Sequence, residues 1–194
     1  MLRKVYIRSI VRLGVEDPDV RPLLSPIESR RMGRLLKRAL WTSIEALRQA
    51  GIDRPDAIVT ATDYGCLESS IAFLNALCSK GELPMRPVHF MQSTHNTIGS
   101  FIGIRLQCHG YNATYSHHGN SFDSALMDGW MQIALGDIDT ALVGWYDEEI
   151  PLFSEMLSAK SVQPEDVALA FVLSASPEGA LRELTLPIDF RDYV

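Results

Sequence analysis

The sequence predicts a layered α/β domain built on a mixed, largely parallel sheet. The main observation is that strand-like apolar segments alternate with segments of helical periodicity along the whole chain, an order typical of βαβ units. The composition, 46% hydrophobic and 22% charged, is that of an ordinary globular protein. A length of 194 residues suits one domain with a substantial core, so we expect residues 1–194 to form a single domain.

The N-terminal part of the chain predicts a strand followed by a long helix. Residues 2–13 alternate apolar and charged side chains, which indicates a strand, and residues 16–26 contain three prolines, which indicates a loop. Residues 29–50 are predicted to be one helix that Gly51 ends. Four apolar side chains would share a face of that helix: Leu36, Leu40, Ile44 and Leu47.

A second strand and two further helices are predicted next. Residues 57–62 form a short apolar run that ends in a turn at Gly65, and a helix then extends to about residue 79. Residues 91–107 again show helical spacing although they include Gly99 and Gly103. Two glycines in one helix are unfavourable, so we expect this helix to lie unusually close to another backbone.

The second half continues the alternation. Residues 111–119 indicate a strand, and residues 122–135 indicate a helix that Gly136 ends. Asn120 and Asp123 have the spacing of a weak capping box at the start of this helix. The remaining elements are expected to be strands over 139–148, 166–176 and 183–190, with a short helix over 151–160.

Charge and hydropathy exclude several classes of partner. A net charge of −6 argues against nucleic acid, whose binding depends on clustered Lys and Arg. The sequence has no long apolar run and no signal-peptide pattern at its start, so we expect a cytoplasmic protein without a membrane partner. An acidic carrier protein would need only a local basic patch, for which the densest candidates are Arg30, Arg31, Arg34, Lys37 and Arg38.

Five segments, taken in order, resemble the N-terminal half of the ketoacyl-synthase family, which has a thiolase-like fold. They are residues 30–47, 57–65, 93–106, 111–119 and 131–145. The fourth and fifth segments are the most specific. Two family signatures serve as anchors for counting: Asn96 is the first, and the second consists of Gly136, Asp137, Asp139 and Gly144. The resemblance covers about residues 1–176 and implies a layered α/β half of a thiolase-like fold, with helices on both faces of the sheet.

Counting from either signature places the family's nucleophilic cysteine position on Gly119. The strand-to-helix segment there, which we call the elbow, reads His117, His118, Gly119, Asn120 and Ser121. A condensing enzyme needs a thiolate at this point to hold the acyl chain as a thioester. The family's two catalytic histidines belong to motifs that this sequence lacks. The resemblance therefore implies no catalytic residue and no cofactor.

A half-length subgroup, the chain length factor-like proteins, is a nearer match because its elbow also lacks cysteine. This similarity implies a non-catalytic subunit that forms a heterodimer with a full-length ketoacyl synthase in polyketide or fatty-acid-like, aryl polyene-type biosynthesis. In such synthases the segment at His89 lies at the dimer interface and lends a residue to the partner's acyl tunnel. The implied tunnel and interface residues are His89, Phe90, Met91, Thr94, His95, Asn96 and Tyr115. An acyl carrier protein is a further implied partner.

Two other functions remain open from the sequence. The first is an independent acyl-handling enzyme that uses His117, His118 or Ser121, and the second is a homodimeric scaffold made of two half-folds. A serine hydrolase that uses His117 and His118 with Ser121 and Asp123 is disfavoured. Adjacent histidines on a strand point to opposite faces, so the two could not act as a pair. We expect no metal site, because Cys108, His109 and the elbow histidines lack ligand spacing and a nearby carboxylate cluster.

Overall fold

The computed structural model describes residues 2–80, 87–151 and 166–193. Six strands form one sheet in the order β3-β2-β4-β5-β1-β6. Their bounds are β1 Tyr6–Arg12, β2 Ala57–Ala61, β3 Tyr111–Tyr115, β4 Thr140–Asp147, β5 Val167–Ser174 and β6 Arg182–Glu183. β2 pairs in parallel with both β3 and β4, whereas the pairs β4–β5, β5–β1 and β1–β6 are antiparallel. β1, β2, β3 and β4 therefore all point the same way, and the predicted mixed, largely parallel sheet is confirmed.

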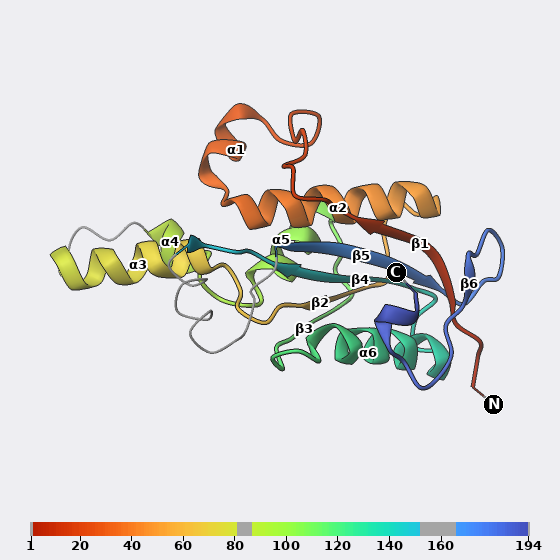
Figure 1. Cartoon of the computed structure of the whole chain (residues 1–194). Coiled ribbons are helices and arrows are strands. Elements are labelled where there is room, and N and C mark those ends of the chain that lie inside the picture. The colour runs from red at the N-terminus through yellow and green to blue at the C-terminus, as the bar shows by residue number, and fades with distance from the viewer. Residues whose placement is uncertain (1, 81–86, 152–165, 194) are drawn as a thin grey trace.

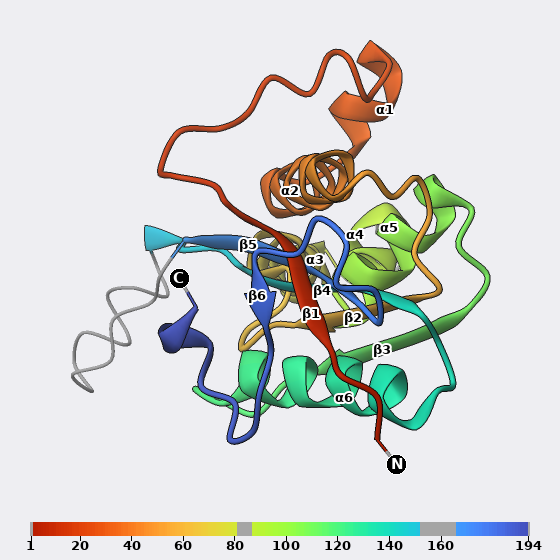
Figure 2. The ribbon, with the colours of Figure 1, turned by 90° about the vertical axis from the view of Figure 1, so that its right-hand side faces the viewer.

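The helices lie on both faces of this sheet, as predicted (Figures 1 and 2). Their bounds are α1 Pro26–Arg31, α2 Arg34–Ala50, α3 Leu67–Lys80, α4 Pro87–Met91, α5 Thr97–Leu106 and α6 Ser121–Leu135, with a short 3-10 turn, η1, at Phe190–Asp192. α2 and α5 cover one face, and α6 covers the other (Figure 2). α3 and α4 extend past the end of the sheet (Figure 1).

Each face of the sheet has its own apolar core. On one face, Leu36, Leu40 and Leu47 of α2 pack with Ile98 and Ile102 of α5. On the other face the core forms between α6 and the sheet, and its buried residues include Phe122, Leu126, Ile133, Val143 and Phe171. Every residue of β5 is buried, which explains why that strand is continuously apolar rather than alternating.

The helix predicted over residues 29–50 is wrong in its first turns. The structure has two helices there, because Met32 adopts an extended conformation after α1 and Gly33 begins α2. α1 starts earlier than predicted, with Ser25 and Glu28 forming a capping box. Gly33 is a poor helix former, and the chain changes direction at this point.

Two other predicted elements also differ. The helix predicted over 91–107 is divided into α4 and α5, because residues 92–96 form turns. The strand predicted over 183–190 is reduced to the two residues of β6; Pro187, which has no N–H to donate to a sheet, lies within the remaining segment. The helix predicted over 151–160 lies almost entirely outside the described residues.

The two glycines of α5 lie close to the sheet, as expected, but the atoms they approach most closely belong to side chains rather than to a backbone. A Cβ added at Gly99 would lie 2.9 Å from Asn112 Oδ1 and 3.0 Å from Thr60 Oγ1, and one at Gly103 would lie 3.2 Å from Asn112 Nδ2. Asn112 Nδ2 also donates to the carbonyl of Gly99 at 3.0 Å. Larger residues at these positions would push α5 away from β2 and β3.

Candidate functional site: the elbow between β3 and α6

The elbow, residues 117–121, lies where β3 ends and α6 begins. β2 and β3 are parallel neighbours, so the turn after β2 meets the elbow at the same edge of the sheet. β3 ends at Tyr115 rather than at residue 119 as predicted, and His118 has a positive φ of 44°. The opposite-face argument for the histidines was therefore wrong, because neither of them is on a strand.

Each of the two elbow histidines lies beside a tyrosine. The ring of His117 stacks with that of Tyr115 at 6.0 Å between centroids, whereas the ring of His118 lies 5.7 Å from that of Tyr64. Both histidines are exposed. The structure therefore places each imidazole beside a different tyrosine.

Asp63, in the turn after β2, contacts the elbow directly. Its Oδ2 accepts the backbone N–H of Gly119 at 3.1 Å. Its Oδ1 accepts the hydroxyl of Ser121, whose Oγ in turn accepts the backbone N–H of His117 at 2.9 Å. The recorded partners of the Ser121 hydroxyl are thus a carboxylate and a backbone amide, and no imidazole in the described part of the chain is among them.

The predicted capping box at the start of α6 is wrong. Asn120 occupies the N-cap position, but its side chain makes no capping hydrogen bond. Asp123 instead accepts the backbone N–H of Phe190 at 2.8 Å, which holds the C-terminal segment against α6. The phenyl ring of Phe190 also packs edge-on against Phe122 and Trp145.

A buried carboxylate, that of Asp147 at the end of β4, organises the turn that carries Asp63. Asp147 is only 4% exposed. It accepts the Thr62 hydroxyl at 2.6 Å, the Trp145 indole N–H at 2.8 Å, and the backbone N–H groups of Asp63 and Tyr64. Burial raises the pKa of Asp147, and the four donors oppose that shift.

The neighbouring carboxylate of Glu148 is also buried and serves the next helix. It accepts the backbone N–H of Glu68, in the first turn of α3, at 2.9 Å. Burial raises the pKa of Glu148, and burial together with these two carboxylates raises the pKa of the Cys66 thiol to about 12. The thiol of Cys66, which follows the turn after β2, is therefore held in its neutral form at neutral pH.

Of the predicted tunnel residues, Tyr115 contacts the elbow through His117, and His95 lies against the turn after β2. Its ring lies 3.4 Å from where a Cβ of Gly65 would be, so His95 covers the turn after β2. Thr94 and Thr97 share a hydrogen bond of 2.8 Å between their hydroxyl groups. Asn96 is at the N-cap position of α5 but makes no capping hydrogen bond with its side chain.

The other predicted tunnel residues are divided between α4 and the sheet edge. Phe90 and Met91 of α4 are 59% and 70% exposed, and the ring of Phe90 lies 5.5 Å from that of Phe73. His89 is in α4, but its side chain lies outside the described part of the structure. Tyr115 is half-buried on β3, far along the chain from α4.

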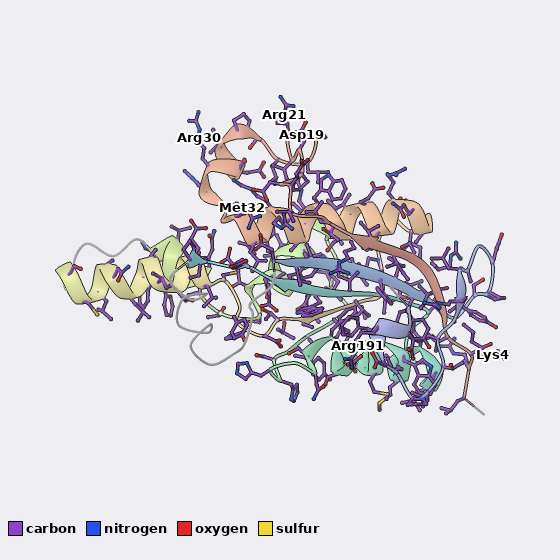
Figure 3. All side chains as sticks on the ribbon, in the orientation of Figure 1. Lys4, Asp19, Arg21, Arg30, Met32 and Arg191 are labelled. Atoms are coloured by element: carbon purple, nitrogen blue, oxygen red, sulfur yellow. The ribbon has the colours of Figure 1, made fainter. Side chains whose placement is uncertain are left out.

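The predicted basic patch is only partly available. Arg34 forms ion pairs with Asp17 and Asp166 at 2.8 and 2.7 Å, and Arg38, 1% exposed, pairs with Asp17 at 3.0 Å. These two arginines therefore hold the loop before α1. Arg30 and Arg31 are exposed, and Arg30 points into solvent from α1 (Figure 3).

Three site residues were missed by sequence reasoning: Asp63 as an elbow contact, Asp147 and Glu148. Asp63 has the sequence setting of an ordinary turn residue. The pair Asp147 and Glu148 follows an apolar strand directly, and acidic residues at the end of a buried strand are the only sequence signal for them.

No three His, Cys, Asp or Glu side chains within residues 2–80, 87–151 and 166–193 form a group that could bind a metal ion. None of the helices in these ranges is long and apolar enough to cross a bilayer.

A match to a family model shows which protein family the chain belongs to. Residues 11–187 match the model of the beta-ketoacyl synthase N-terminal domain. The chain belongs to the beta-ketoacyl synthase family. This membership confirms the resemblance drawn from the five sequence segments.

Solved structures of this family share the fold. The ketosynthase ApeO in complex with its chain length factor ApeC, from Xenorhabdus doucetiae, matches with a TM-score of 0.67 and 22% identity over 82% of this chain and 63% of that chain. The ishigamide ketosynthase/chain length factor matches with a TM-score of 0.71 and 17% identity over 93% and 63%. A complex of the type II polyketide synthase AntDE with the acyl-carrier protein AntF matches with a TM-score of 0.80 and 14% identity over 93% and 65%. The chain thus spans less than two thirds of the length of these structures, and the likeness concerns the fold.

Proposed function

We propose that this beta-ketoacyl synthase family member is a non-catalytic, chain length factor-like subunit. In this proposal it pairs with a complete ketoacyl synthase in polyketide or fatty-acid-like biosynthesis of the aryl polyene type and shapes the partner's acyl tunnel. The observation that carries the proposal is the elbow. The strand, turn and helix are all in place, but residue 119 has no side chain and the adjacent Ser121 hydroxyl is bonded to Asp63 and to a backbone amide.

The edge of the sheet supports a protein partner. β3 is the last strand of the sheet and pairs only with β2 among the described strands, so its outer edge offers backbone donors and acceptors. Exposed apolar side chains lie on the extension formed by α3 and α4, where Leu74, Phe90 and Met91 are all more than half exposed. Apolar groups in such positions are typical of protein interfaces.

The chain would contribute shape rather than chemistry. The partner would supply the thiolate and the catalytic histidines, and bulky side chains of α4 and of residues 94–96 would decide where the growing acyl chain stops. An acyl carrier protein, which one of the structural neighbours binds according to its description, would deliver the chain to the partner. Arg30 and Arg31 are the exposed basic residues of the predicted patch that remain available for an acidic carrier.

The test is to co-express the chain with a complete ketoacyl synthase encoded next to it. We expect one heterodimer by size-exclusion chromatography with light scattering, and after incubation with acyl-carrier protein we expect the acyl adduct only on the synthase in intact mass spectra. Phe90→Asp should weaken the complex, whereas the matched change Leu181→Asp, at an exposed leucine beside β6, should not. An acyl adduct on this chain, or a homodimer that ignores the synthase, would contradict the proposal.

A further inference from the structure

The carboxylate of Asp63, in the turn after β2, lies against the elbow. Asp63 accepts the Gly119 backbone N–H at 3.1 Å and the Ser121 hydroxyl, so one carboxylate uses two hydrogen-bond donors at the start of α6. No ion pair joins Asp63 to an arginine, lysine or histidine in the described part of the chain. The carboxylate therefore faces the elbow with its two donors, one backbone N–H and one hydroxyl, at the positive end of α6.

Asp147 fixes the position of Asp63 by accepting hydrogen bonds from the turn that carries it. The two backbone N–H groups of residues 63 and 64 and the Thr62 hydroxyl all donate to that one buried carboxylate. Thr62 Oγ1 also accepts the N–H of Gly65 at 2.8 Å. The turn is thus hydrogen-bonded on both sides of Asp63, which directs its side chain toward the elbow.

We propose that Asp63 is a built-in anion of the elbow that occupies the backbone donor of residue 119 and disfavours any further negative charge there. A thiolate, or the oxyanion of an attacked thioester, would have to displace this carboxylate or lie next to it. Two like charges in neighbouring positions repel each other, and the repulsion is stronger at a protein surface than in water. Asp63 therefore disfavours acyl chemistry at this elbow, in addition to the missing cysteine.

This inference rests on the proposed function, because it explains why the acyl thioester would stay with the partner. It can nevertheless fail separately. The chain-length and complex-formation tests depend on α4 and the β3 edge, whereas the inference concerns only Asp63 and residue 119. Its experiments are therefore made on the isolated chain.

The first experiment follows the backbone amide of Gly119 by NMR in the 15N-labelled chain during an acid titration. If Asp63 binds this amide, the Gly119 N–H resonance will shift as the carboxylate is protonated, and Asp63→Asn will abolish the shift. The matched control is Asp53→Asn. This change removes an exposed carboxylate that forms no hydrogen bond or ion pair with the described residues, and it should leave the Gly119 titration unchanged. A Gly119 resonance that titrates equally in the Asp63→Asn variant would overturn the inference.

The second experiment introduces a thiol at the elbow. A Cβ at residue 119 meets nothing within 4 Å, although the φ of +96° strains any side chain there. We expect Gly119→Cys combined with Asp63→Asn to react with iodoacetamide about three- to tenfold faster at pH 7.5 than Gly119→Cys alone, with a smaller difference in 1 M NaCl. Gly119→Cys combined with Asp53→Asn should match the single variant. Equal rates with and without Asp63 would refute the charge effect, and if the cysteine variants do not fold, the NMR titration decides alone.

Discussion

The carboxylate of Asp147 accepts the backbone N–H of Asp63 at 3.1 Å through one oxygen and at 2.9 Å through the other. This contact joins the end of β4 to the turn after β2, and Asp63 extends the connection to the elbow. The end of β4, the turn after β2 and the start of α6 are therefore linked by two successive carboxylates.

Replacing Asp147 with asparagine should destabilise the chain. The amide keeps one acceptor oxygen but presents an NH₂ group to donors that now bind a carboxylate, and leaving a buried donor unpaired costs about 1–3 kcal/mol. Urea unfolding should show the loss, and Asp53→Asn, at an exposed site, should change stability by less than about 0.5 kcal/mol. Equal effects of the two variants would show that the Asp147 hydrogen bonds do not stabilise the turn.

Stability should fall as pH rises from about 4.5 toward neutrality. Burial raises the pKa values of Asp147 and Glu148 in the folded chain, so the folded chain binds protons there that the unfolded chain releases near pH 4. Their contribution is fully present below that pH and is lost as pH rises through the raised values. Asp19 and Glu45, whose pKa values are lowered to about 2, affect stability only at lower pH.

The measurement is urea unfolding at intervals between pH 4.5 and 7. The double variant Asp147→Asn with Glu148→Gln should reduce the slope of the unfolding free energy against pH. A slope that is the same in the double variant and in the natural chain would show that the two carboxylates titrate normally.

Gly119→Cys should not restore condensation. The new thiol would have to replace a glycine at φ +96°, and generating the attacking carbanion requires the family's two catalytic histidines, whose motifs this sequence lacks. The measurement is malonyl-thioester condensation by the isolated variant, with product detection by mass spectrometry. Formation of a condensed product by this variant, but not by the natural chain, would refute the non-catalytic assignment.

Substitutions in and beside α4 should change the length of the product made with the partner synthase. His89→Ala or Phe90→Ala removes bulk and should allow additional extension units, whereas Thr94→Phe adds bulk and should shorten the product, because extra methylenes in a filled pocket cost about 1–3 kcal/mol. Mass spectrometry of the reconstituted system gives the distribution. Leu181→Ala, at an exposed leucine beside β6, is the control, and an unchanged distribution in an intact complex would exclude this segment from the tunnel.

Gly99→Ala should displace α5 from the sheet. Its Cβ would lie 2.9 Å from Asn112 Oδ1 and 3.0 Å from Thr60 Oγ1, and overpacking of this kind costs about 1–3 kcal/mol. Thermal or urea unfolding should show the loss. Gly14→Ala, whose added Cβ meets nothing within 4 Å, is the control, and a Gly99→Ala variant as stable as Gly14→Ala would mean that α5 adjusts without cost.

The sequence by itself determined the class of fold and the position of the elbow. Short apolar runs and helical periodicity depend on neighbours a few residues apart, so the sequence shows β2, β4, β5 and the helical segments that contain α5 and α6 directly. Family signatures at Asn96 and Gly136 then locate Gly119 by counting. The ends of helices and strands were harder to predict from the sequence. The break at Gly33 and the turns of residues 92–96 depend on caps and on contacts made after folding.

Only the tertiary structure decided what surrounds the elbow. Asp63 lies 56 residues before Gly119, and Asp147 lies 84 residues after Asp63; they meet because β2 is the parallel neighbour of both β3 and β4. The same holds for Arg34 and Arg38, which look like a surface patch in the sequence but are bound to acidic residues and backbone carbonyls of distant loops. Such contacts depend on which strands become neighbours and on how deeply each charge is buried, and local sequence patterns carry neither quantity.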